Sequence, residues 1–191
     1  MMRPIRDLAL AIVIAVTVGL ASAAIAINQR ANSGAASSGP WVARTGVAAG
    51  QADPYARAAA AATVDLPLGT AEGLAFVAAA DGAGRPLETD CAYNVTGRSL
   101  PARLWTLTAY DGAGLLMGNP SGRNGYNSRN LVRSADGSFV IAVAETPQAG
   151  NWIPISGDGL LLVLRLYDTP LTTGLAPADL ALPTIERGAC P

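Results

Sequence analysis

Residues 104–168 constrain the fold most, because they read as a succession of strands joined by tight turns. Residues 104–110 alternate apolar residues with threonines, the period-2 pattern of a strand with one buried face. A second such run covers 139–145. A third, 160–168, is apolar at every position before Arg165, which predicts a strand buried on both faces or central in its sheet. A buried helix is the alternative, but the flanking glycines and proline leave room for only about nine residues.

Asp-Gly pairs at 81–82, 111–112 and 136–137 each lie next to an apolar run of the chain. Asp-Gly supplies the positive-φ positions that a tight hairpin needs, so the pairs predict hairpin turns. None has the alternating acidic spacing of a calcium loop. We expect no metal and no cofactor.

The step Asn151-Trp152-Ile153-Pro154 interrupts the pattern. Pro154 cannot donate to a sheet and biases Ile153 towards an extended conformation. One interpretation is a corner between sheets, with Trp152 filling the core. The other is a Trp that lines a ligand cleft.

A family resemblance rests on several short motifs, which are Asn119-Pro120, Arg129, Asp136-Gly137-Ser138, 151–154 and Arg165-Leu166-Tyr167. In order and approximate spacing they resemble the family of domains of unknown function called DUF1214, over roughly 102–187. The resemblance implies an all-β, jelly-roll-like sandwich and no established reaction. Longer relatives carry an upstream domain of the DUF1254 type. This chain is too short to contain it, so we expect a membrane-anchored short form.

The basic residues are unusual, because the chain has no His and all thirteen of them are Arg. Missing His excludes His-based triads and the commonest zinc ligands. Missing Lys excludes Schiff-base chemistry and the P-loop lysine. The net charge of −1 offers no basic surplus for phosphates, so we expect no nucleic-acid partner.

The N-terminus predicts a membrane segment. Residues 1–7 form a net positive leader, and 8–27 are twenty residues without a charge, long enough to cross a bilayer. Arg3 and Arg6 place the N-terminus in the cytoplasm by the positive-inside rule. We therefore expect a single-pass protein of a bacterial inner membrane with a periplasmic domain. A cleaved signal peptide is the alternative, since small residues at 21–26 offer cleavage sites.

The remaining chain predicts one exported, mainly antiparallel β-sandwich over 41–191. Residues 28–40 are rich in Ala, Ser and Gly and read as a flexible spacer. Asp53-Pro54 predicts the start of one short helix of about ten residues. Residues 71–80 are ambiguous. We favour a strand there, with 87–94 as its hairpin partner.

Cys91 and Cys190 are the two cysteines of the chain. An even number in an exported domain favours a disulfide bond between them. Two free thiols are the alternative.

The candidate ligand-binding residues are Arg129, Asn151, Trp152, Arg165 and Tyr167. Arg side chains suit carboxylates and Trp suits a sugar face, so together they predict an anion or sugar-acid site. The alternative for Arg165 is a structural ion pair with an Asp such as Asp136 or Asp168.

Glu88 and Asp90 lie two apart, which would place both carboxylates on one face of a strand. They could bind a cation or act as an acid/base pair. A solvated strand edge is the alternative.

Two hypotheses for function follow. The first is a non-enzymatic binding or assembly module of the cell envelope, whose partners are the membrane, through its N-terminal helix, and an envelope protein or glycan. The second is a carbohydrate-active hydrolase or lyase that uses carboxylates and Tyr. No carboxylate pair at a decisive position supports the second, and catalytic residues are not assigned.

Because the charge-free run exceeds the roughly 7–15 apolar residues of a signal peptide, we expect the mature protein to keep its N-terminal segment. Mass spectrometry of the mature chain measures this. A first residue near Ala24 or Ile27 would contradict the anchor.

Overall fold

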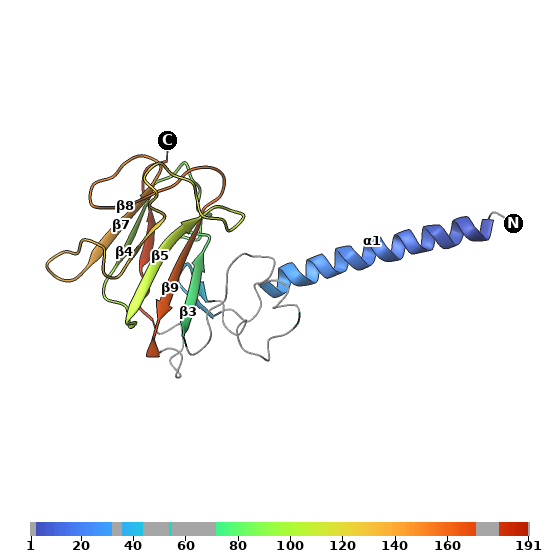
Figure 1. Ribbon diagram of the computed structural model, residues 1–191, viewed down its shortest axis with the longest axis horizontal. Helices are drawn as coiled ribbons and strands as arrows, with labels where there is room; N and C mark the ends of the chain where they lie inside the picture. Colours follow the sequence, from blue (N-terminus) through green and yellow to red (C-terminus); the bar gives the residue numbers. More distant parts are fainter. Residues whose placement is uncertain (1–2, 32–35, 44–53, 55–71, 171–179, 191) are drawn as a thin grey trace.

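The computed structural model describes residues 3–31, 36–43, 54, 72–170 and 180–190. One helix, α1 (Arg3–Ala31), is followed by ten strands in two sheets (Figure 1). The chain is therefore mainly β with a single N-terminal helix among the described residues, and the predicted sandwich is confirmed. The short helix expected to start at Asp53-Pro54 lies outside the described residues, apart from Pro54.

The larger sheet has six strands, all antiparallel. Their order is β1 (Ala36–Ser38), β2 (Trp41–Ala43), β3 (Gly73–Ala78), β9 (Leu161–Tyr167), β5 (Leu104–Tyr110) and β6 (Gly125–Asn127). The run expected to be central is therefore central, because β9 lies between β3 and β5.

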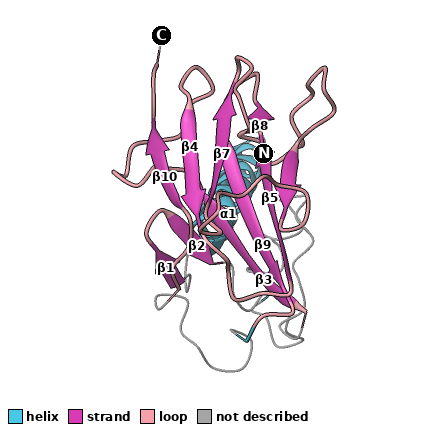
Figure 2. Ribbon diagram, turned by 90° about the vertical axis from the view of Figure 1, so that its left-hand side faces the viewer, coloured by secondary structure: helices cyan, strands magenta, loops and turns pink. Residues whose placement is uncertain are grey.

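The smaller sheet has four strands, which Figure 2 shows side by side. Their order is β10 (Thr184–Arg187), β4 (Tyr93–Gly97), β7 (Phe139–Ala144) and β8 (Asn151–Pro154). The pair β7–β8 is parallel, which departs from the antiparallel expectation. The Asn-Trp-Ile-Pro step is thus an edge strand rather than a corner.

The core forms between the inner faces of the two sheets. Along β5 the odd positions Trp105, Leu107 and Ala109 are 1–2% exposed and the residues between them are half-buried. Trp105 meets Phe139 of the facing sheet with ring centroids 5.0 Å apart. Fully burying one such aromatic side chain contributes about 2–3 kcal/mol, so this pair is a main link between the layers.

Hydrogen bonds close the sandwich along both of its long sides. On one side, Trp41 Nε1 donates to the Pro183 carbonyl at 2.7 Å, just before β10. On the other, the Trp152 backbone N–H donates to the Tyr126 hydroxyl at 3.0 Å, which links β8 to β6. The outer edge of β10 is also covered, because Gly82 N donates to the Ile185 carbonyl. Capped edges of this kind prevent uncontrolled strand pairing.

The Asp-Gly turns form, but two of them differ from the expected geometry. In the loops that begin at Asp81 and Asp111, the positive-φ residue is the second glycine, Gly84 (79°) or Gly114 (81°). The Asp carboxylate accepts hydrogen bonds from the backbone two and four residues on, at 2.8–2.9 Å in both loops. Of these three pairs, only Asp136-Gly137 has positive φ at the glycine that directly follows Asp.

Two further expectations about elements need correction. Residues 87–94 are not the hairpin partner of β3: β4 begins at Tyr93 and pairs with β7 and β10 in the other sheet. The turn at Asp81 is flanked by an isolated antiparallel bridge between Ala80 and Pro86, and not by a second strand of a hairpin. Regular structure also enters the stretch expected to be a spacer, because α1 continues to Ala31 and β1 begins at Ala36.

Within α1, residues 5–26 form a 22-residue span with a mean hydropathy of 2.6, none of it buried. That length and composition fit a membrane anchor and also a signal sequence.

The predicted disulfide joins Cys91 to Cys190, with Cα atoms 4.2 Å apart and a sequence separation of 99. It ties the C-terminal residues to the segment before β4. Ala92 and Gly188 support it with backbone hydrogen bonds, Ala92 N to Ala189 O and Gly188 N to Ala92 O. The alternative of two free thiols is therefore wrong.

Replacing both cysteines with serine should lower the free energy of unfolding by at most about 5 kcal/mol, because a loop of about 100 residues is no longer closed in the unfolded chain. Thermal melts of the full chain in detergent measure this. Reduction should bring the wild type to the melting temperature of the double variant and leave the variant unchanged. A wild-type melting temperature that is insensitive to reduction would contradict the role given to the bond.

Candidate functional site

Arg165 and Tyr167 lie on β9, on the outer face of the six-stranded sheet. Arg165 Nη1 donates to the Tyr110 hydroxyl at 3.0 Å, and its guanidinium carbon is 5.6 Å from the Tyr110 ring centroid. The strand register places Val163 in the row between the rows of Arg165 and Tyr110. Val163 is only 5% exposed although it faces outward, so the Arg165–Tyr110 pair helps to cover it.

The ion pair expected for Arg165 is not formed with either proposed acid. Asp136 pairs with Arg98 and Asp168 with Arg103, each at 3.1 Å. Hydrogen bonds from the hydroxyl and backbone of Ser138 lower the pKa of Asp136. The Arg165 guanidinium instead donates to an aromatic hydroxyl, that of Tyr110, a contact that the alternating pattern of the strand does not reveal.

Asn151 is a buried structural residue at the start of β8. Its side-chain amide donates to the carbonyls of Val132 (2.8 Å) and Val140 (2.9 Å), and its side-chain oxygen accepts from Val132 N at 2.7 Å. The Asn151 side chain thereby connects the loop at Val132 to β7 at Val140, because it satisfies backbone groups of both.

Trp152 does not fill the core. It pairs with Ala142, whose neighbours Ile141 and Val143 are fully buried. Paired residues share a face of a sheet, so Trp152 lies on the outer face of the four-stranded sheet. It is half-buried, and its indole N–H donates to the Ala144 carbonyl at 2.9 Å. The interpretation of Trp152 as a core residue is wrong, because the register of β8 against β7 points Asn151 and Ile153 inward instead.

Arg129 follows β6 and is exposed, and its backbone N–H donates to the Asn127 side chain at 2.9 Å. The structure therefore does not bring the five candidates together. Trp152 and Arg165 lie on opposite outer faces of the sandwich, and Asn151 is used internally. Ligand binding by any of them stays a prediction.

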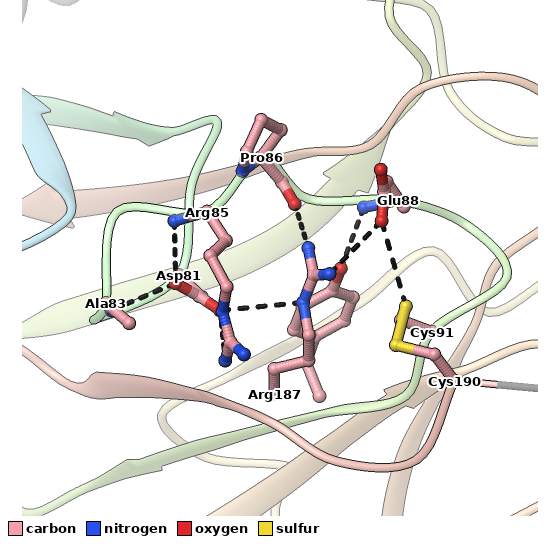
Figure 3. A network of polar contacts seen from close by, with 9 residues as sticks. Asp81, Ala83, Arg85, Pro86, Glu88, Cys91, Arg187 and Cys190 are labelled. Atoms are coloured by element: carbon pink, nitrogen blue, oxygen red, sulfur yellow. Dashed lines mark hydrogen bonds and ion pairs between the residues drawn. A yellow bond between two sulfur atoms is a disulfide. The ribbon is translucent and has the colours of Figure 1, made fainter.

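A polar network that the sequence did not reveal surrounds Asp81 (Figure 3). The Asp81 side chain is 1% exposed, and one of its oxygens lies 2.8 Å from both Nε and Nη2 of Arg85. Arg187 Nε is 3.5 Å from the same oxygen. Arg187 is itself 14% exposed and also donates to Glu88 at 3.1 Å. The network fixes the end of β10 against the loop that follows β3.

The same region contains three groups spaced like metal ligands. A side-chain atom from each of Glu88, Asp90 and Cys91 lies within 4.8 Å of the others. Cys91 is bonded to Cys190, so its sulfur cannot be a thiolate ligand, and its 3.9 Å approach to Glu88 is no hydrogen bond. Two exposed carboxylates remain. They lie outside any strand, so the expected shared strand face is wrong.

Burial of the Asp81 carboxyl acts to raise its pKa. Hydrogen bonds from the backbone and guanidinium of Arg85 and from the backbone of Ala83 outweigh that effect. The pKa of Asp81 therefore lies below its ordinary value of 3.8. A carboxyl with a lowered folded-state pKa stabilises the fold above its unfolded pKa, and this contribution is lost as pH falls.

Melting temperatures should consequently fall on acidification from about pH 5 to about pH 2, with a smaller fall in Asp81→Asn. Asp81→Asn should also be less stable than the wild type at neutral pH, because Arg85 and Arg187 lose their shared carboxylate. Asp111→Asn is the matched control: its amide oxygen can accept the same two backbone hydrogen bonds, and no ion pair is lost among the described residues. Equal destabilisation by the two variants would contradict this role for Asp81.

Two solved structures are similar to this chain to different degrees. The VPA0106 protein from Vibrio parahaemolyticus superimposes with a TM-score of 0.59 at 17% identity, over 73% of this chain and 36% of that one. An uncharacterised protein from Burkholderia cenocepacia has 18% identity and a TM-score of 0.41, over 90% of this chain and 50% of that one. The chain thus spans about a third to a half of these proteins, and the first likeness shows the fold alone.

A search of curated proteins gives no match. A family model for proteins of unknown function, DUF1214, matches residues 72–171, which is 100 of the 191 residues. The match runs from just before β3 to just past β9, and so contains the Asp81 loop, Trp152 and Arg165. Because the match covers more than half of the chain, this protein belongs to the DUF1214 family.

Proposed function

We propose that this protein is a membrane-anchored binding module that presents its β-sandwich on the oxidising side of a bacterial inner membrane. The N-terminus is cytoplasmic and the domain periplasmic. The observation that carries the proposal is the Cys91–Cys190 bond, because disulfides persist in exported domains and are rare in the cytosol. The apolar span of 22 residues in α1 supports it independently.

Binding is favoured over catalysis because the buried polar side chains Asp81 and Asn151 serve structural contacts. Asp81 is held by Arg85 and Arg187, and Asn151 by Val132 and Val140. Among the described residues, no observation favours the carbohydrate-active hydrolase or lyase. The edges of the sandwich are capped at β8 and β10, so a partner would approach an open face or a loop cluster.

The export proposal predicts that the two cysteines are oxidised in living cells. Cells expressing the full chain are quenched with acid, and free thiols are labelled with a polyethylene-glycol maleimide. The wild type should show no labelling before reduction and two labels after it. A control lacking residues 1–27 should be labelled twice without reduction, since it stays in the cytosol.

External protease gives the orientation. It should digest the sandwich domain in spheroplasts and leave it intact in whole cells. Reduced cysteines in the wild type, or digestion only after lysis of the spheroplasts, would contradict the proposal.

A further inference from the structure

The outer face of the four-stranded sheet carries two rows of side chains that the structural core does not use. Strand pairing places Glu186, Asn94, Ala142 and Trp152 in one row across β10, β4, β7 and β8. The next row contains Thr184, Thr96 and Val140. The residues between the rows are buried, including Val95 and Ile141 at 0% exposed, so both rows face outward. We call these two rows the Trp152 face.

One half of the Trp152 face is apolar. It consists of Trp152, Ala142 and Val140, of which Val140 is 48% exposed. The Trp152 indole N–H is already bonded to the Ala144 carbonyl. This bond fixes the ring, and the ring surface left to a ligand is apolar. A fixed aromatic surface beside small and branched apolar residues is suited to stacking.

The other half is polar and uncommitted. Asn94 and Glu186 are exposed, and within the described residues their side chains have no hydrogen-bond partner. The only charge in the two rows is the negative charge of Glu186. An anionic ligand would meet repulsion here and no arginine. This charge argues against the sugar acid that the sequence suggested.

We propose that the Trp152 face binds a neutral oligosaccharide. A sugar ring has an apolar C–H surface and a rim of hydroxyl groups, which match the apolar and polar halves of the face. Trp152 stacks against one ring while Asn94 and Glu186 exchange hydrogen bonds with the hydroxyls of the chain. Adjacent strands are about 4.8 Å apart, comparable with one sugar unit, so a glycan laid across the strands places successive units over successive strands.

This inference rests on the proposed binding function and names its ligand class. It does not depend on where the protein lies in the cell. If the cysteines are reduced in cells, the export proposal fails and the oligosaccharide titration can still be interpreted. If the titration is silent, the binding proposal fails and the export proposal is unaffected.

The test is calorimetric titration of the full chain, with its disulfide intact, in a zwitterionic detergent that has no sugar headgroup. Cellotetraose and chitotetraose are the neutral probes, and tetragalacturonate is the charged probe of equal length. We expect at least one neutral probe to bind with a dissociation constant of about 1 mM or tighter. Tetragalacturonate should bind more weakly, because Glu186 repels it.

Variants locate the site. Trp152→Ala should weaken binding by about tenfold or more, as expected for loss of a central aromatic contact. Asn94→Ala should weaken it less. Tyr110→Leu is the matched control, since it removes a half-buried aromatic side chain from the opposite outer face and should leave the affinity unchanged. If Trp152→Ala fails to fold, Trp152→Phe keeps a stacking ring without the bond to Ala144 and should retain part of the affinity.

Three results would overturn the proposal: no heat with either neutral probe, tighter binding of tetragalacturonate, or a loss of affinity in Tyr110→Leu equal to that in Trp152→Ala. A protein crosslinked at position 152 in cells, with both neutral probes silent, would assign the face to a protein partner instead.

Discussion

The fold depends on covering β9, a strand that is apolar at almost every position. Its two edges are paired with β3 and β5, and its inner face packs against the four-stranded sheet. The outer face is the difficult one, because Val163 points away from the core and still requires protection from water. Arg165 and Tyr110 provide part of that cover by a hydrogen bond and a cation–π contact over the row of Val163. A charged residue in an apolar strand is thus explained by packing.

The two ends of the chain are fixed by different means. The N-terminal strands β1 and β2 join the edge of the larger sheet, where Trp41 is fully buried and bonded to Pro183. The C-terminal strand β10 is held by Arg187, which reaches Asp81 and Glu88, and by the bond from Cys190 to Cys91. These contacts explain how a domain with short edge strands keeps both sheets in register.

The sequence was informative where a single local rule decides the outcome. The alternation in β5, the apolar run of β9 and the pairing of two cysteines in an exported domain each follow from such a rule. The rest depended on contacts across the sandwich. Asp81 resembled Asp111 in sequence, because both begin Asp-Gly-Ala-Gly, yet only Asp81 meets the distant Arg187. The face of Trp152 stayed open between the core and a cleft because nothing in the four-residue step indicates its register against β7. Spacing alone could not show that Trp152 and Arg165 face opposite sides.

The central claim is that Trp152 is the half-buried, outward-facing tryptophan of a domain whose other two tryptophans are core residues, at 0% and 2% exposed for Trp41 and Trp105. Iodide quenching of tryptophan fluorescence tests it directly in the native full chain. The account predicts that a single fraction of the emission is accessible to iodide and that Trp152→Phe removes it. Emission that is fully shielded in the wild type, or an accessible fraction that survives in Trp152→Phe, would contradict the placement of Trp152 on the outer face.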